Sequence, residues 1–187
     1  MESVEGRSAR VRPITATEVE QGYDVASGLE GVLVYRLAQT GTEEQFRAVA
    51  EAVGQMEEAA LAEHKQRWAE ADERFHSLLS EFGGNPLLSV MMERVQTVIG
   101  RLRFLALHLD PLSGRGSTEE HRAVSDALTA RHGKLARELH QAHWDRVRDV
   151  NTPLLRNGFS GTSAYLFEGS LIRTTGDQAK QNSSPST

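Results

Sequence analysis

The segment "ADERFHSLLSEFGGNPLL", residues 71–88, contains the pattern that decides the fold. Its apolar residues recur every three to four positions, which is the period of an amphipathic helix packed against a core. The residues "GGNP" then predict a turn, since glycine and proline interrupt helices. Asp72 and His76 are about one helical turn apart, so both side chains point to the same face of this helix.

Helical patterns continue on both sides of this segment, from about residue 15 to residue 152. Capping-box patterns predict helix starts at Thr15, at Thr42 and at Ser117, and Pro153 is expected to close the last helix. Only a few residues separate the predicted helices, and short connections make neighbouring helices antiparallel. The sequence therefore predicts an all-α antiparallel bundle of about six to seven helices.

The length and composition favour one domain with a substantial core. The chain has 187 residues, which is short for two domains. We assign residues 15–156 to the helical bundle and residues 157–187 to a C-terminal extension rich in Gly, Ser, Thr and Asn. An apolar stretch in this extension, "SAYLFEGSLI" (residues 163–172), is interpreted as a strap on the bundle or a dimer arm, and the end of the chain is expected to be disordered.

The charge and cysteine content narrow the functional classes. The formal net charge is −5, so nothing favours general binding to nucleic acid, and the basic cluster Arg7, Arg10 and Arg12 is typical of a solvated tail. There are no cysteines, which excludes disulfides and thiolate metal ligands. No membrane span or signal peptide is evident. We expect a soluble, cytoplasmic protein that does not associate with membranes.

Three histidines fall at predicted core-facing positions on three different helices: His76, His121 and His143. Together with Asp72 they supply three imidazoles and one carboxylate, a set that suits Zn, Ni, Fe or Mn. Alternatively, each histidine is an ordinary hydrogen-bonded residue, although a buried Asp72 would still need a partner. The remaining histidines fit the pattern less well, and we interpret them as residues at the surface or behind the ligands: His64, His108, His132 and His140.

Three motif blocks carry a family resemblance: "DERFHSLLSEFGGNPLL", "RLRFLALHL" and "STEEHRAVSDALTARHGKLARELHQAHWDRV". From about Thr15 to Leu155 the chain resembles the FCD domain, the effector-binding half of many GntR-family transcriptional regulators. In the metal-binding members of that family one Asp and three His coordinate a divalent metal. The resemblance implies that Asp72 and His76 of "DERFH", His121 of "EEH" and His143 of "QAHWDRV" are those ligands, with zinc as the first expectation.

The resemblance also implies an effector and partners. FCD effectors are typically small organic acids, and Arg101 and Arg103 lie on the long helix that lines the family's cavity. One of them is a candidate to bind the carboxylate of the effector, and the alternative is that both are surface arginines. The resemblance further implies a homodimer. "GRSARVRPI" (residues 6–14) is similar to the end of a winged-helix domain and its linker, so we assign residues 1–14 to a linker remnant. DNA contact is expected only through a winged helix-turn-helix domain absent from this chain.

Two functions follow from these observations. In the first, the domain is a metal-dependent sensor of a small organic acid within a GntR-family transcriptional regulator. In the second, it is a stand-alone metalloenzyme that acts on a small carboxylate. The same four ligands serve both functions, and no catalytic residue is identified beyond His140 as a weak acid–base candidate. We favour the sensor because the resemblance is long.

Overall fold

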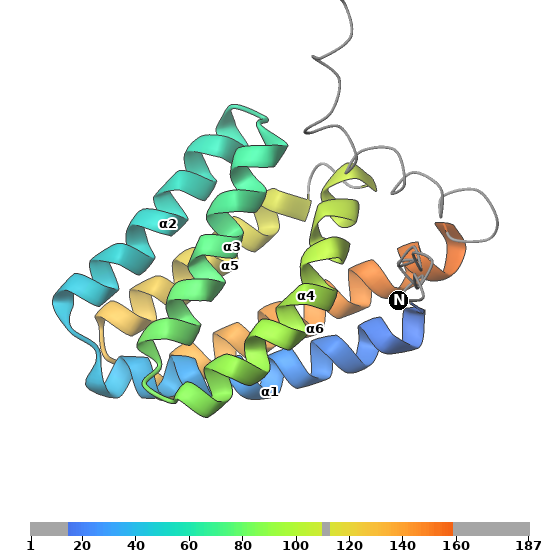
Figure 1. Ribbon diagram of the computed structural model, residues 1–187. Coiled ribbons are helices and arrows are strands. Elements are labelled where there is room, and N and C mark those ends of the chain that lie inside the picture. The colour runs from blue at the N-terminus through green and yellow to red at the C-terminus, as the bar shows by residue number, and fades with distance from the viewer. Residues whose placement is uncertain (1–14, 110–112, 159–187) are drawn as a thin grey trace, which may run out of the picture.

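The computed structural model describes residues 15–109 and 113–158. Within these residues the chain forms six helices and no strand (Figure 1): α1 Ala16–Thr40, α2 Glu43–Leu61, α3 Lys65–Phe82, α4 Pro86–Leu109, α5 Ser113–Thr129 and α6 Gly133–Gly158. The predicted all-α bundle is confirmed. The linker remnant and the apolar stretch at residues 163–172 lie outside the described residues.

Local sequence signals set the starts of the first two helices. The side chains of Thr15 and Thr42 accept hydrogen bonds from the backbone N–H of Glu18 and Gln45. In return, the side chains of Glu18 and Gln45 accept from the backbone N–H of the two threonines, which completes two capping boxes. Between α3 and α4, Gly84 adopts φ of +66°, a left-handed conformation that glycine tolerates without strain. These three predicted boundaries are therefore explained by local chemistry.

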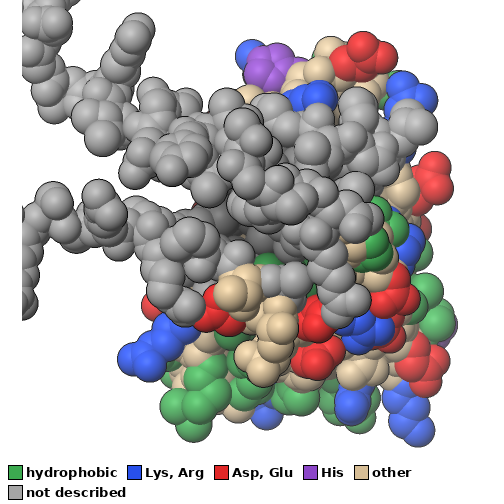
Figure 2. Space-filling model, turned by 90° about the vertical axis from the view of Figure 1, so that its right-hand side faces the viewer, with side chains coloured by type: hydrophobic (Ala, Val, Ile, Leu, Met, Phe, Trp, Pro, Cys, Tyr) green, Lys and Arg blue, Asp and Glu red, His purple; other side chains and the backbone are tan. Residues whose placement is uncertain are grey.

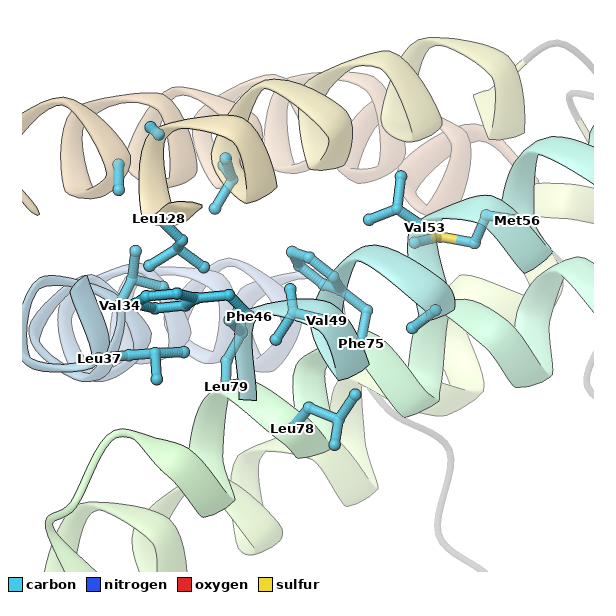
Figure 3. Close-up of a cluster of buried hydrophobic side chains, with 14 of the residues drawn as sticks. Val34, Leu37, Phe46, Val49, Val53, Met56, Phe75, Leu78, Leu79 and Leu128 are labelled. Carbon is cyan, nitrogen blue, oxygen red and sulfur yellow. The ribbon is translucent and has the colours of Figure 1, made fainter. Parts of the chain in front are cut away.

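The helices pack so that distant parts of the sequence lie side by side (Figure 1). Helix α1 lies along α6 and also contacts α4, whereas α2 packs against α3 and α5. Figure 3 shows the larger apolar cluster, in which side chains from α1, α2, α3 and α5 meet. A second cluster joins α1, α4 and α6 around Tyr23, Leu33, Met92 and Trp144. The polar site described below lies beside both clusters.

One predicted helix start is wrong. Ser117 does not cap α5, because this helix begins at Ser113 and Ser117 lies inside it. One bond within α5 and one tertiary contact stabilise the additional turn. The Thr118 hydroxyl donates to the carbonyl of Gly114 at 2.7 Å and accepts from the indole N–H of Trp68 on α3 at 2.8 Å. The local pattern favoured a later start than these contacts allow.

The predicted end of the last helix is also wrong. Pro153 lies inside α6, which continues to Gly158. Proline lacks an N–H and therefore removes one hydrogen bond from the helix. Packing of this turn against α1 compensates, since the Asn151 side chain donates a buried hydrogen bond to the hydroxyl of Tyr23 at 2.9 Å.

One face of the described residues is mixed in charge. On the face shown in Figure 2, acidic and basic side chains are interspersed among apolar ones. None of the six helices, within the part of the chain that the structure describes, is long and apolar enough to cross a membrane.

Candidate metal centre

The structure brings the four predicted ligands together from three helices. Asp72 and His76 extend from α3, His121 from α5 and His143 from α6, and all four are almost completely buried. The Nε2 atoms of His76 and His121 are 3.3 Å apart. Asp72 Oδ1 lies 3.9 Å from the first of these atoms and 3.6 Å from the second. Each of the three histidines offers a ring nitrogen within 4.8 Å of the others.

Each of the three histidines uses its Nδ1 atom to contact a different acceptor. For His76 the acceptor is Glu30 Oε2 at 2.8 Å, and for His143 it is Glu120 Oε2 at 2.7 Å. For His121 it is the carbonyl oxygen of Ser117, one helical turn earlier. Metal-bound histidines typically donate their second ring nitrogen to a carboxylate or a backbone carbonyl in this way.

These acceptors determine the tautomers. A carbonyl oxygen only accepts hydrogen bonds, so His121 carries its proton on Nδ1, and the Glu30 carboxylate places the proton of His76 on Nδ1 as well. In the neutral rings, both Nε2 atoms are then lone pairs. Two lone pairs that face each other at 3.3 Å in a buried site repel unless a cation or a proton lies between them.

The geometry fits a transition metal. Two nitrogen ligands at 2.0–2.1 Å from one ion are separated by about 2.9 Å at a right angle and about 3.3 Å at a tetrahedral angle. The observed separation of 3.3 Å is within this range. Imidazole nitrogens with one carboxylate are ligands that suit Zn, Ni, Fe and Mn, whereas Ca and Mg prefer oxygen.

Burial favours the neutral forms of two of the histidines, His121 and His140. Burial lowers the pKa of His121 well below its ordinary value of 6.5, and the neighbouring His143 and His76 lower it further. Burial also lowers the pKa of His140, although the hydrogen bond from this ring to Glu30 opposes the effect. Neutral imidazoles are the forms that bind metals.

Glu30, which the sequence prediction missed, lies at the centre of a second buried cluster. Its side chain is completely buried, and Oε2 accepts from His76 Nδ1 and His140 Nε2, both at 2.8 Å, and from the indole N–H of Trp144 at 3.1 Å. Burial raises the pKa of Glu30, whereas the charge and the hydrogen bonds of His76 and His140 lower it. The lowering is larger, so the pKa of Glu30 lies well below its ordinary value of 4.5. One signal was available: Glu30 interrupts the buried stripe of α1 between Ala26 and Leu33.

Glu120 was likewise missed by the sequence prediction. Its carboxylate accepts from His143 and forms an ion pair with Arg146, whose Nη2 also donates to the Ser117 hydroxyl at 2.8 Å. Glu119, by contrast, is exposed. Glu120 therefore anchors a predicted ligand and an arginine at the same time.

The remaining predicted residues lie elsewhere. His64 and His132 are exposed, as expected, whereas His140 is completely buried behind His76 and Glu30. Arg101 and Arg103 belong to α4, but their side chains, like that of His108, lie outside the described residues. Their roles stay predictions, as do the roles of the four candidate ligands.

Comparisons with known proteins agree with the architecture. The sequence matches the FCD domain family over residues 21–146. No curated protein matches it significantly. Among solved structures, "Streptococcus agalactiae GntR" is similar with a TM-score of 0.60 and 21% sequence identity, over 70% of this chain and 58% of that one.

A second solved structure is similar with a TM-score of 0.64 and 14% identity, over 75% of this chain and 66% of that one. It is described by the words "Lar controls the expression of the Listeria monocytogenes agr system and mediates virulence". At these identities the likeness concerns the fold, and this chain covers less than two thirds of either protein. The family match covers most of the helical bundle, and the chain therefore belongs to the FCD domain family, the regulatory effector-binding domains of GntR-family regulators.

Proposed function

We propose that this domain binds a divalent transition metal through Asp72, His76, His121 and His143, and that the metal receives a small organic acid. The observation that carries the proposal is the pair of facing Nε2 atoms, 3.3 Å apart, beside the Asp72 carboxylate. A buried divalent cation stabilises an anion that reaches it, which makes a carboxylate the expected type of effector. Zinc is the first expectation, and Ni, Fe and Mn are the others.

The surrounding residues support this function in two ways. The Nδ1 bonds of His76, His121 and His143 hold the three rings in fixed orientations before any ion binds. The Phe75 ring packs nearly perpendicular to the His121 ring at 4.3 Å between centroids, which excludes water from that side. Rigid ligands in a dry site bind a metal more tightly, because less ordering is required on binding.

Regulation would follow from unequal binding to two states of the domain. The candidate ligands come from α3, α5 and α6, so an ion or an effector bound there affects how three helices pack. An effector shifts a conformational equilibrium only to the extent that it binds one state better than the other. In the proposed regulator, such a shift is passed to a winged-helix DNA-binding domain. The proposed assembly is a homodimer, which sedimentation analysis tests.

The test is elemental analysis of the purified domain, followed by calorimetric titration of the metal-free protein with Zn²⁺, Ni²⁺ and Mn²⁺. Replacing any of the four candidate ligands with Ala is expected to weaken metal binding strongly. His64→Ala and His132→Ala are matched controls, because both residues are exposed. Loss of metal in the controls, with the four ligand variants unaffected, would overturn the assignment.

The effector is tested on the metal-loaded protein with a panel of small organic acids. Heat of binding is measured together with the mass of any product. Saturable binding that disappears on chelation, without product, is the result expected of a sensor. Metal-dependent conversion of an acid would instead identify the domain as an enzyme.

A further inference from the structure

Four hydrogen-bond donors surround the buried carboxylate of Glu30. It extends from α1, whereas its partners come from α3, α4 and α6. Oε2 contacts His76, His140 and Trp144, and Oε1 accepts from the Gln96 side chain at 3.3 Å. The side chains of Glu30 and His140 are completely inaccessible to solvent. A buried carboxylate is stable only when hydrogen bonds replace its hydration, and here four donors from three other helices do so.

The position of Glu30 connects it with the candidate metal centre. His76 lies between two carboxylates, since Nδ1 contacts Glu30 at 2.8 Å and Nε2 faces Asp72 Oδ1 at 3.9 Å. A neutral imidazole carries one proton, which can be on either nitrogen. The carboxylate that holds the proton decides which nitrogen is left with the lone pair. The Nδ1–Glu30 distance of 2.8 Å is a hydrogen-bond distance, whereas the Nε2–Asp72 distance of 3.9 Å is too long for one, so the proton is on Nδ1.

Glu30, His76 and His140 also satisfy the donor spacing of a metal site in their own right. The indole of Trp144 argues against that reading. Its N–H lies 3.1 Å from Oε2, the same oxygen that both imidazoles contact. An indole nitrogen donates hydrogen bonds and does not bind metals. With an indole and two imidazoles around Oε2, this oxygen is a hydrogen-bond acceptor and not a free ligand.

We propose that Glu30 is a positioning residue for the metal centre: it holds the proton of His76 on Nδ1, so that Nε2 faces the metal as a lone pair. The effect of Glu30 on metal affinity rests on the proposed function, whereas the hydrogen bond between Glu30 and His76 does not. The negative charge of Glu30 also makes His76 a more basic ligand, as outer carboxylates do in other histidine sites. His140 and Trp144 hold the carboxylate in place through hydrogen bonds to the same oxygen, Oε2.

The first test requires no metal. Nitrogen-15 NMR of the histidine rings in the metal-free protein reports which nitrogen of His76 is protonated. In the wild-type protein we expect Nδ1–H. In Glu30→Met the acceptor is lost, and we expect the proton to move to Nε2, where it can approach Asp72. Gln96→Ala is the matched control, because Gln96 contacts Oε1 and not the oxygen that binds His76.

The second test is metal affinity, measured by competition with a chelating dye and Zn²⁺. Loss of an outer partner of a histidine ligand typically weakens affinity by about 10–100-fold, and we expect a loss in this range for Glu30→Met. Glu30→Gln retains the shape and one acceptor oxygen but removes the charge, so a smaller loss is expected. Gln96→Ala is expected to bind zinc like the wild-type protein.

The outcomes separate this proposal from the proposed function. If the wild-type protein binds no metal, the proposed function fails and the NMR result alone decides the role of Glu30. A folded Glu30→Met with an unchanged His76 tautomer would overturn the proposal. If Glu30→Met does not fold, unchanged zinc affinity in Glu30→Gln would overturn it instead. Two zinc ions per chain, the second lost in His140→Ala, would also overturn it by making Glu30 a ligand.

Discussion

His76 and His121 face each other through Nε2 atoms 3.3 Å apart, while the acceptors of both rings lie on the opposite side, at Nδ1. This arrangement leaves two lone pairs turned inward in a buried site. It is unfavourable for the protein alone and favourable for a cation, because the cost of orienting the ligands is already met by the fold.

Metal is expected to stabilise the folded domain. An ion that binds only the folded form at 100 times its dissociation constant adds about 2.7 kcal/mol to the free energy of unfolding. Urea denaturation in the presence of Zn²⁺ and in the presence of a chelator measures this difference. In His121→Ala the two curves are expected to coincide, whereas His132→Ala is expected to retain the difference.

Acid is expected to destabilise the metal-free domain in two separate pH ranges. Folding lowers the pKa values of His121 and His140. Their contribution to the free energy of unfolding is therefore complete above pH 6.5, and it is lost below pH 6.5 as the unfolded chain takes up protons. The loss approaches about 1.4 kcal/mol per pH unit for each such group. The pKa of Glu30 is also lowered, and its contribution is lost only below its ordinary value of 4.5.

Unfolding free energies measured between pH 7.5 and pH 5 therefore isolate the histidines. A profile that is flat in this range for the wild-type protein would contradict the burial of neutral imidazoles. His121→Gln is expected to reduce the slope, because this residue then no longer titrates in either state.

Glu120→Gln is expected to weaken zinc binding by about 10–100-fold, because Glu120 is the outer partner of His143. The variant also removes the ion pair with Arg146. Glu119→Gln is the matched control, since the neighbouring carboxylate is exposed. Equal zinc affinities for the two variants, measured by calorimetry, would show that His143 does not depend on Glu120.

Trp144 is expected to report metal binding through its fluorescence. Its ring lies 5.0 Å from that of His76 and 5.4 Å from that of His143, between centroids. The chain has two tryptophans, so Trp68→Phe leaves Trp144 as the only indole emitter. Titration of this variant with Zn²⁺ is expected to change the emission up to one equivalent. The same titration of Trp68→Phe combined with His76→Ala is expected to produce no change.

The sequence alone determined the features that depend on local chemistry. The apolar period predicted the helices, the two threonine caps set the starts of α1 and α2, and a spacing of one turn placed Asp72 and His76 on one face. Each of these features involves residues close together in the chain, where the helical repeat determines which side chains are neighbours.

Tertiary structure decided everything that depends on contacts between helices. Glu30 meets His140, which is 110 positions later, because α1 lies along α6, and Glu120 meets His143 because α5 packs against α6. The early start of α5 and the continuation of α6 through Pro153 also depend on such contacts. The helical period relates residues within one helix only. Which outer carboxylate supports which histidine is set by how the helices pack, and that is why sequence reasoning placed the candidate ligands but missed their partners.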